Sequence, residues 1–232
     1  MGAPTFDDHI NSMTAPSDAR LAAVGETLKG VGPQALREFE QLRDVTSAMP
    51  RLGREGADGA TKLRGDTSLP YDHRTRGAED RLAFHKAAIQ KHYEFAVAGS
   101  GRLEAELMVG LLPKPVKDEQ RSLVQHEVEL VLGGASGQEL VRRAIAALGK
   151  DPRHDAELLS SYGHSLFRGQ GVEDSFGSLK AQAVTKYLAL DGGTDKQQAS
   201  RKALVAFRAA NMAGSVASYR AAGLLALARD DR

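Results

Sequence analysis

Apolar residues recur every three or four positions over most of the chain, and no convincing stretch alternates between apolar and polar residues. The first pattern lines one face of an α-helix, whereas a half-buried strand needs the second. The sequence therefore predicts an all-α protein with at least eight helices, consecutive ones antiparallel. From Ala78 onward, helices are expected over residues 78–96, 100–112, 118–132, 136–148, 152–168, 176–190 and 215–229, with another that opens at Thr194.

The N-terminal part predicts a small helical hairpin behind a loosely attached tail. The tail covers residues 1–16. Ser17 can cap a helix that stops at Gly30, and Pro33 suits the first turn of the next helix. Tail and hairpin together are assigned to residues 1–49.

Glycine, proline and charged residues dominate the stretch 50–77. This composition is typical of loops, so a flexible linker is expected there. The dense helical pattern that follows is assigned to a helical repeat domain over residues 78–232, on the grounds given below. Inside that domain, the helix over 118–132 carries its apolar positions at Leu123, Val124, Val128 and Val131.

Polar residues with capping geometry mark several of the helix starts. A Ser or Thr followed three residues later by Glu or Gln can form a capping box, and an Asp before a Pro can cap a first turn. Three such signals occur, at Ser136 with Glu139, Thr194 with Gln197, and Asp151 with Pro152.

Composition changes this picture little, but it excludes several classes of function. Hydrophobic residues make up 41% of the 232 positions and aromatic residues 5%, which favours helices packed through small side chains. The net charge is +1, and no basic stripe with interleaved aromatics occurs, so no nucleic-acid partner is expected. Cysteine is absent, which excludes disulfides and thiolate metal sites.

Targeting signals are not visible in the sequence. No stretch approaches the roughly 18 apolar residues of a membrane span, so none is expected. The N-terminus has acidic residues where a signal peptide needs a basic and then an apolar region. The expected location is the cytoplasm, or the periplasm or exterior if a signal peptide has been removed.

No arrangement of residues commits the chain to a reaction. His85 and His92 are two helical turns apart within an apolar stripe, and His154 beside Asp155 is interpreted as surface polarity, so no metal site is expected. Ser160 and His164 could touch on one helix, but no nucleophile elbow or oxyanion hole accompanies them. We therefore expect no catalytic residues and no cofactor.

Glycines and small residues recur in a pattern that resembles a known repeat. GRLEAELMVGLL at 101–112 and GSVASYRAAGLLAL at 214–227 both have a glycine, a small residue four positions on, a glycine nine positions on, and then two leucines. YGHSLFRGQGVED at 162–174 adds Gly-x5-Gly-x-Gly-Val. Together these segments resemble the Sel1-like repeat, a relative of the tetratricopeptide repeat.

The resemblance covers residues 78–229 and is degenerate. Phe167 stands at the family's tyrosine position, Asp174 lies one residue early, and Pro113 and Pro115 replace glycines. It implies a right-handed array of antiparallel helix pairs. Helices in such an array meet at glycines, so Gly110, Gly163 and Gly223 are predicted to lie where helices cross. The alternative is a non-repetitive helical domain with coincidental glycines.

The resemblance implies a protein–protein interaction adaptor or scaffold, of the kind found in bacterial signalling, secretion or envelope assembly. Its partner would be a peptide or helix held in a concave groove lined by the first helix of each pair. The candidate partner-binding residues on those helices are Arg102, Glu106, Ser160, His164 and Arg220. The alternative is a secreted effector or enzyme whose site is built from scattered residues.

Overall fold

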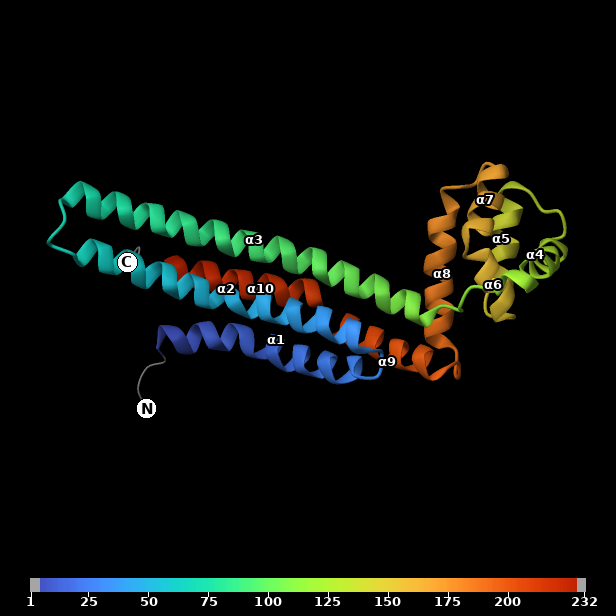
Figure 1. Ribbon diagram of the computed structural model, residues 1–232, viewed down its shortest axis with the longest axis horizontal. Helices are drawn as coiled ribbons and strands as arrows, with labels where there is room; N and C mark the ends of the chain where they lie inside the picture. The colour runs from blue at the N-terminus through green and yellow to red at the C-terminus, as the bar shows by residue number, and fades with distance from the viewer. Residues whose placement is uncertain (1–4, 229–232) are drawn as a thin grey trace. The chain divides into compact units, whose positions relative to one another are not determined.

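A computed structural model describes residues 5–228 of the chain. Over this range the chain forms ten helices and no strand, which confirms the all-α prediction. The helices are α1 (Phe6–Leu28), α2 (Pro33–Gly65), α3 (Tyr71–Leu111), α4 (Asp118–Leu132), α5 (Gly137–Ala147), α6 (Pro152–Leu158), α7 (Ser161–Gly169), α8 (Ser175–Ala189), α9 (Asp195–Ala209) and α10 (Met212–Leu227) (Figure 1).

The helices group into two compact units. The first contains the described residues up to Glu106 and those from Lys202 onward, and the second contains Leu107–Arg201. The boundaries fall within α3 and within α9. The divisions expected from the sequence, at residues 49 and 77, coincide with neither boundary, because the C-terminal helix packs with the N-terminal ones.

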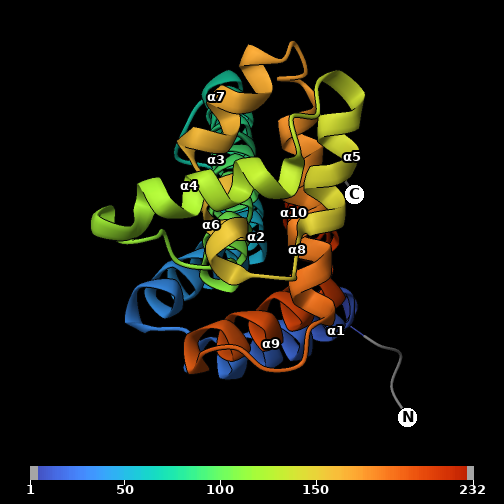
Figure 2. The ribbon, with the colours of Figure 1, turned by 90° about the vertical axis from the view of Figure 1, so that its right-hand side faces the viewer.

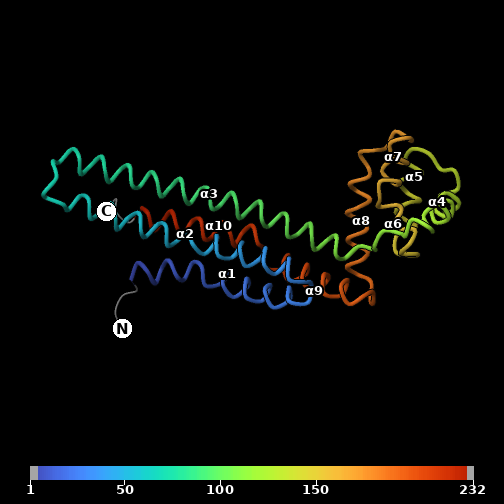
Figure 3. Tube along the Cα trace, viewed as in Figure 1, coloured from blue at the N-terminus to red at the C-terminus, as the bar shows by residue number. Residues whose placement is uncertain are grey.

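In the first unit, α1, α2 and α10 pack side by side, and the early part of α3 lies against α2 and α10 (Figures 1 and 3). Successive helices α1, α2 and α3 run antiparallel, whereas α10 runs parallel to α2. The core consists of large apolar side chains from all four helices, among them Ile10, Leu21, Leu28, Phe39, Leu42, Met49, Ile89, Leu103 and Val216.

Glycines bring α2 and α10 into backbone contact. A Cβ placed on Gly223 would lie 2.7 Å from the carbonyl oxygen of Met49, and a Cβ on Gly53 would meet the carbonyl oxygen of Gly223. No side chain fits between the two helices at this point, so their backbones touch directly. The prediction that Gly223 lies where helices cross is confirmed.

The prediction that residues 50–77 form an irregular linker is wrong. Helix α2 continues to Gly65, α3 begins at Tyr71, and only a short turn separates them. The small residues of this stretch serve packing: Gly53 faces α10, while a Cβ on Gly56 would lie 2.8 Å from that of His85 in α3. The low apolar content of this stretch suggested a loop, but it reflects small residues that pack at a helix interface.

The expected tail is also mostly helical, since α1 begins at Phe6. Thr5 and Asp8 form a capping box, and Ile10 is buried against α10. Ser17 therefore lies buried inside α1 and does not cap it. The part of the tail before Thr5 lies outside the described residues.

Helix α3 merges two helices that the sequence separated near Ser100. The hydroxyl of Ser100 donates to the carbonyl oxygen of Val97, 2.8 Å away in the preceding turn. It thus bonds within a continuous helix, where a cap would have bonded to the amides that follow.

The second unit is built from α4 to α8 and the ends of α3 and α9 (Figure 2). Its core is a continuous apolar cluster whose buried members include Val124, Val128, Leu132, Leu140, Leu148, Leu158, Phe167, Phe176 and Leu179. The ammonium group of Lys186 in α8 donates to the carbonyl oxygens of Ile145 and Leu148, 3.0 Å each, at the end of α5. This cation satisfies carbonyls that a helix end leaves free.

The predicted helix over 152–168 is divided. Helix α6 ends at Leu158, and Ser160 caps α7 by accepting a hydrogen bond from the amide of Tyr162 at 3.1 Å. A Cβ on Gly163 would overlap the carbonyl of Leu158. Gly163 thus permits this tight break within one segment, whereas a crossing of two distant helices had been predicted.

The three predicted capping signals have different outcomes. The carboxylate of Asp151 accepts from the amide of Arg153, as expected of a cap. Thr194 and Gln197 bond reciprocally, which confirms their capping box. The capping box at Ser136 is wrong, because no side-chain cap bond forms there and Glu139 pairs with the arginines of the next turn.

Candidate functional site

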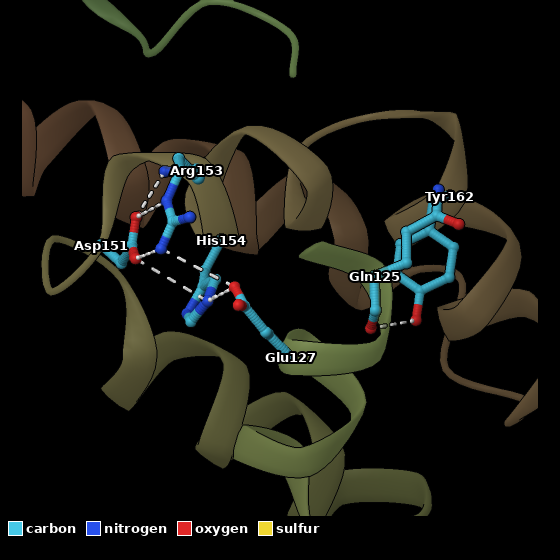
Figure 4. A network of polar contacts seen from close by, with 6 residues as sticks. All are labelled: Gln125, Glu127, Asp151, Arg153, His154 and Tyr162. Atoms are coloured by element: carbon cyan, nitrogen blue, oxygen red, sulfur yellow. Dashed lines mark hydrogen bonds and ion pairs between the residues drawn. The ribbon is translucent and has the colours of Figure 1, made fainter. Parts of the chain in front are cut away.

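A network of polar side chains in the second unit lies between α4 and the start of α6 (Figure 4). Nε2 of His154 lies 3.1 Å from Oε2 of Glu127 in α4 and 3.8 Å from Oδ2 of Asp151. The guanidinium of Arg153 lies between the same two carboxylates, 2.8 Å from Asp151 and 3.7 Å from Glu127. The helix start thus presents a cation and an imidazole to two acids.

The carboxylate of Asp151 has two roles in this network. It caps α6, and it accepts hydrogen bonds from the side chain and the amide of Arg153. These bonds, the side-chain bond foremost, hold the pKa of Asp151 below its ordinary value, and the nearby His154 adds to the effect. Asp151 is therefore the ionised anchor of the network.

A second set of contacts joins α4 to the far end of α6. The amide of Gln125 donates to Oε2 of Glu157 at 2.9 Å, and the guanidinium of Arg121 lies 3.5 Å from Oε1 of the same carboxylate. Glu157 is buried, with 1% of its surface exposed. A buried carboxylate requires such partners, so these contacts fix α6 against α4.

The hydroxyl of Tyr162 extends the network to α7. It lies 3.4 Å from the backbone oxygen of Gln125 and 3.1 Å from Oε1 of Glu129. Burial, together with the hydrogen bond to the carboxylate, raises the pKa of Tyr162 to about 12. The phenol stays protonated and acts as a donor.

The interpretation of His154 and Asp155 as surface polarity is wrong for Asp155, because its side chain is completely buried. Its Oδ2 accepts hydrogen bonds from the amide of Gly149 and the hydroxyl of Tyr187, each at 2.7 Å, while Oδ1 has no hydrogen-bond partner. Burial raises the pKa of this carboxyl despite both bonds. Asp155 is thus a buried acid of the second unit whose burial outweighs its two hydrogen bonds.

These groups serve chiefly to join helices. Each carboxylate of the network has a partner: a backbone or side-chain amide, a histidine, an arginine or the Tyr162 hydroxyl. His154 has 18% of its side chain exposed. Within residues 5–228, no group of three or more metal-binding side chains is arranged to hold an ion. The arrangement can orient α4, α6 and α7, and it provides no nucleophile beside a base.

The candidate partner-binding residues fall in both units. Arg102, Glu106 and Arg220 belong to the first unit, and Ser160 and His164 to the second. Arg102 is exposed and its guanidinium lies over the ring of Phe95, whereas Arg220 and Glu106 are half-buried.

Ser160 and His164 bond to other residues and not to each other. The hydroxyl of Ser160 donates to the carbonyl oxygen of Glu157 at 2.7 Å, which places it at the junction of α6 and α7. Nε2 of His164 lies 3.0 Å from Oε1 of Glu173, and its ring packs on Phe176. The serine acts as a helix cap, and the histidine contacts a glutamate at the surface.

His85 and His92, the two histidines of the apolar stripe in α3, contact their own helix or the neighbouring one. Nδ1 of His92 lies 2.9 Å from the carbonyl oxygen of Ala88, one turn earlier. His85 is buried where α3 meets Gly56 of α2, and its Nδ1 has no partner.

Sequence reasoning missed an exposed apolar surface on α4. Leu123, Leu130 and Val131 have 57%, 67% and 49% of their surface exposed. The spacing of seven between Leu123 and Leu130 could have revealed this surface, because it defines a second stripe distinct from that of Val124 and Val128. The sequence had grouped Leu123 and Val131 with these two buried valines.

Comparison with protein-family models, with curated proteins and with solved structures found no match. None of the helices within residues 5–228 combines the length and the apolar character that a membrane crossing requires.

Proposed function

We propose that this chain is a protein-binding module, an adaptor or scaffold that presents helix surfaces to a partner protein. The observation that carries the proposal is the uncovered apolar surface of α4, where two leucines and a valine are about half exposed or more. Exposed apolar side chains gathered on one helix are typical of surfaces that bind other proteins.

The polar network supports the same proposal because it fixes the arrangement of the helices. Its carboxylates, its histidine and its tyrosine are engaged in contacts between helices, as described above. A module of this kind needs a fixed helix arrangement, because a preorganised surface loses less conformational entropy when it binds.

The Sel1-like arrangement of helix pairs is part of the proposal. It is supported by Gly110 and Gly223, where a Cβ would come within close contact of Ser200 and Met49 respectively. Both glycines end the repeated pattern of a glycine, a small residue and a glycine before two leucines. Close helix contacts at equivalent positions are what a degenerate repeat would retain.

Affinity purification from the native host, read by quantitative mass spectrometry, tests this function. The tagged full chain should enrich a specific protein over a tagged control helical protein. Arg102→Glu should weaken that capture with little change in Tm, because both this side chain and Phe95, the ring that it lies over, are exposed. Lys86→Glu is the matched control, since it reverses an exposed charge on a different face of α3. Failure to enrich any protein, or turnover that depends on His164, would overturn the proposal.

Arg220 is unsuitable for this test, although the sequence grouped it with Arg102. Its guanidinium lies 4.7 Å from the ring centroid of Tyr93, and its Nε is buried without a partner. Charge reversal there would remove a cation–π contact and place a carboxylate beside the ring, so a loss of binding could not be separated from a loss of stability.

A further inference from the structure

The exposed surface of α4 has a defined geometry. Leu123 and Leu130 lie two helical turns apart, about 10 Å along the axis, and Val131 lies at the edge of this surface, about 100° around the helix from Leu130. The opposite side of the helix, through Val124, Val128 and Leu132, is buried in the core of the second unit. We call Leu123, Leu130 and Val131 the α4 stripe.

Helix α4 is rich in carboxylates, and one of them, Glu119, lies on the face of the α4 stripe. Helix α4 contains four acidic residues and one arginine: Asp118, Glu119, Glu127, Glu129 and Arg121. The guanidinium of Arg121 lies 2.8 Å from Asp118 and also reaches the buried Glu157, so it faces away from the stripe. Glu119 precedes Leu123 by one turn on the same exposed face and is itself exposed. The stripe is therefore both apolar and acidic.

This charge selects among the possible occupants. A second copy bound through the same surface would place these acids opposite their own equivalents, which is repulsive. An anionic bilayer surface would repel them as well. A helix with leucines on one face and lysines or arginines beside them would satisfy both the apolar and the acidic parts.

We infer that the α4 stripe is the docking site for a cationic amphipathic helix of a partner protein. This inference rests on the proposed function and names the class of partner. Leucines one and two turns apart on the partner pack on Leu123 and Leu130, and its cations approach Glu119. Because these charges are exposed, salt weakens the complex.

The test uses the full chain and a fluorescein-labelled peptide of leucine and lysine, about four helical turns long, with the leucines on one face. Fluorescence anisotropy should show binding, and a peptide with glutamate in place of lysine should bind more weakly. Leu123→Ser with Leu130→Ser should weaken binding of the lysine peptide at least about tenfold. Val109→Ser with Val205→Ser is the control, since both valines are exposed on other helices.

A second pair of variants tests the charge. Glu119→Lys should weaken binding of the lysine peptide, whereas Glu79→Lys changes the net charge equally on α3 and should leave it unaltered. Equal binding by wild type and the serine variant, preference for the glutamate peptide, or no binding would overturn the inference. So would self-association in analytical ultracentrifugation that the serine variant abolishes.

The same variants separate this inference from the proposed function. If the native partner is still captured by the Leu123→Ser, Leu130→Ser chain, the docking site lies elsewhere and the binding function stands. If the peptide binds to the stripe but no protein is captured from the host, the proposed function fails although the surface recognises cationic helices.

Discussion

The hydroxyl of Tyr187 donates a hydrogen bond to Oδ2 of Asp155 at 2.7 Å, inside the core of the second unit. The same oxygen accepts from the amide of Gly149. One carboxylate therefore connects α6, α8 and the turn that follows α5. Because Asp155 is completely buried, each of its two bonds compensates part of the free energy lost when the carboxylate leaves water.

Tyr187→Phe should lower the free energy of unfolding by about 1.5–3 kcal/mol, the range for a hydrogen bond to a charged group. The substitution removes only the hydroxyl and leaves the ring packing intact. Urea denaturation of both proteins at neutral pH measures the effect. Tyr71→Phe is the control, because 72% of Tyr71 is exposed, and it should be close to neutral. Equal losses in the two variants would contradict the role of the bond.

Asp155 should make stability depend on pH in the direction opposite to a paired surface carboxylate. Its pKa in the folded state is raised above the ordinary value of 3.8, so the fold favours the protonated acid. The associated stability is fully present below the unfolded pKa and is lost as pH rises through the folded pKa. The stability of wild type relative to Asp155→Asn should thus fall from about pH 3.5 upward and then level off.

Urea denaturation of both proteins across the acidic range tests this dependence. Asparagine keeps an oxygen that can accept from Tyr187 and Gly149 but does not titrate. Taking the difference between the two proteins cancels the other carboxylates. A difference that is constant or rises with pH would show that burial does not raise the pKa of Asp155.

Gly223→Ala should destabilise the protein by about 1–3 kcal/mol, because the new Cβ would lie 2.7 Å from the carbonyl oxygen of Met49. The gain in helix propensity, at most about 1 kcal/mol, does not offset this overlap. Gly101→Ala is the matched control in the same unit, with no atom within 4 Å of the new Cβ. It should raise Tm slightly, and a comparable rise for Gly223→Ala would disprove the backbone contact.

The capping residues should differ in their effect on stability. Thr194→Ala removes the acceptor for the amide of Gln197, 3.3 Å away, and should cost about 1 kcal/mol. Ser136→Ala removes no cap bond and should change stability far less, although both residues precede a helix with the same sequence signal. Thermal unfolding of the two variants decides the matter, and equal losses would contradict the assignment.

The sequence predicted the helical class and several helix bounds because these depend on local signals. Helix α4 has the predicted bounds, ending at the left-handed Gly133, and Asp151 and Pro152 start α6 as expected. Periodicity and caps are properties of neighbouring residues, so they can be read without knowledge of the fold.

The errors concern residues whose role depends on a distant segment. Gly53 and Gly56 lower helix propensity locally, but they lie in a helix because α10 and α3 pack on them. Asp155 looked like a polar surface residue beside His154, and only its partner Tyr187, on another helix, explains its burial. The polar network and the α4 stripe were missed for the same reason. The apolar periodicity of a single helix does not show which of its faces the other helices cover.

The backbone contact between Gly223 and Met49 also limits how α10 can change in length. Adding one residue between Met212 and Gly223 would rotate everything after it by about 100° around the helix axis. Ala222 would then take the place of the glycine against α2, where no side chain fits. An insertion of three or four residues is close to a full turn, so it would bring Gly223 back to the side of α10 that faces α2, one turn further along. The residue that then lies against Met49 would still have to be glycine.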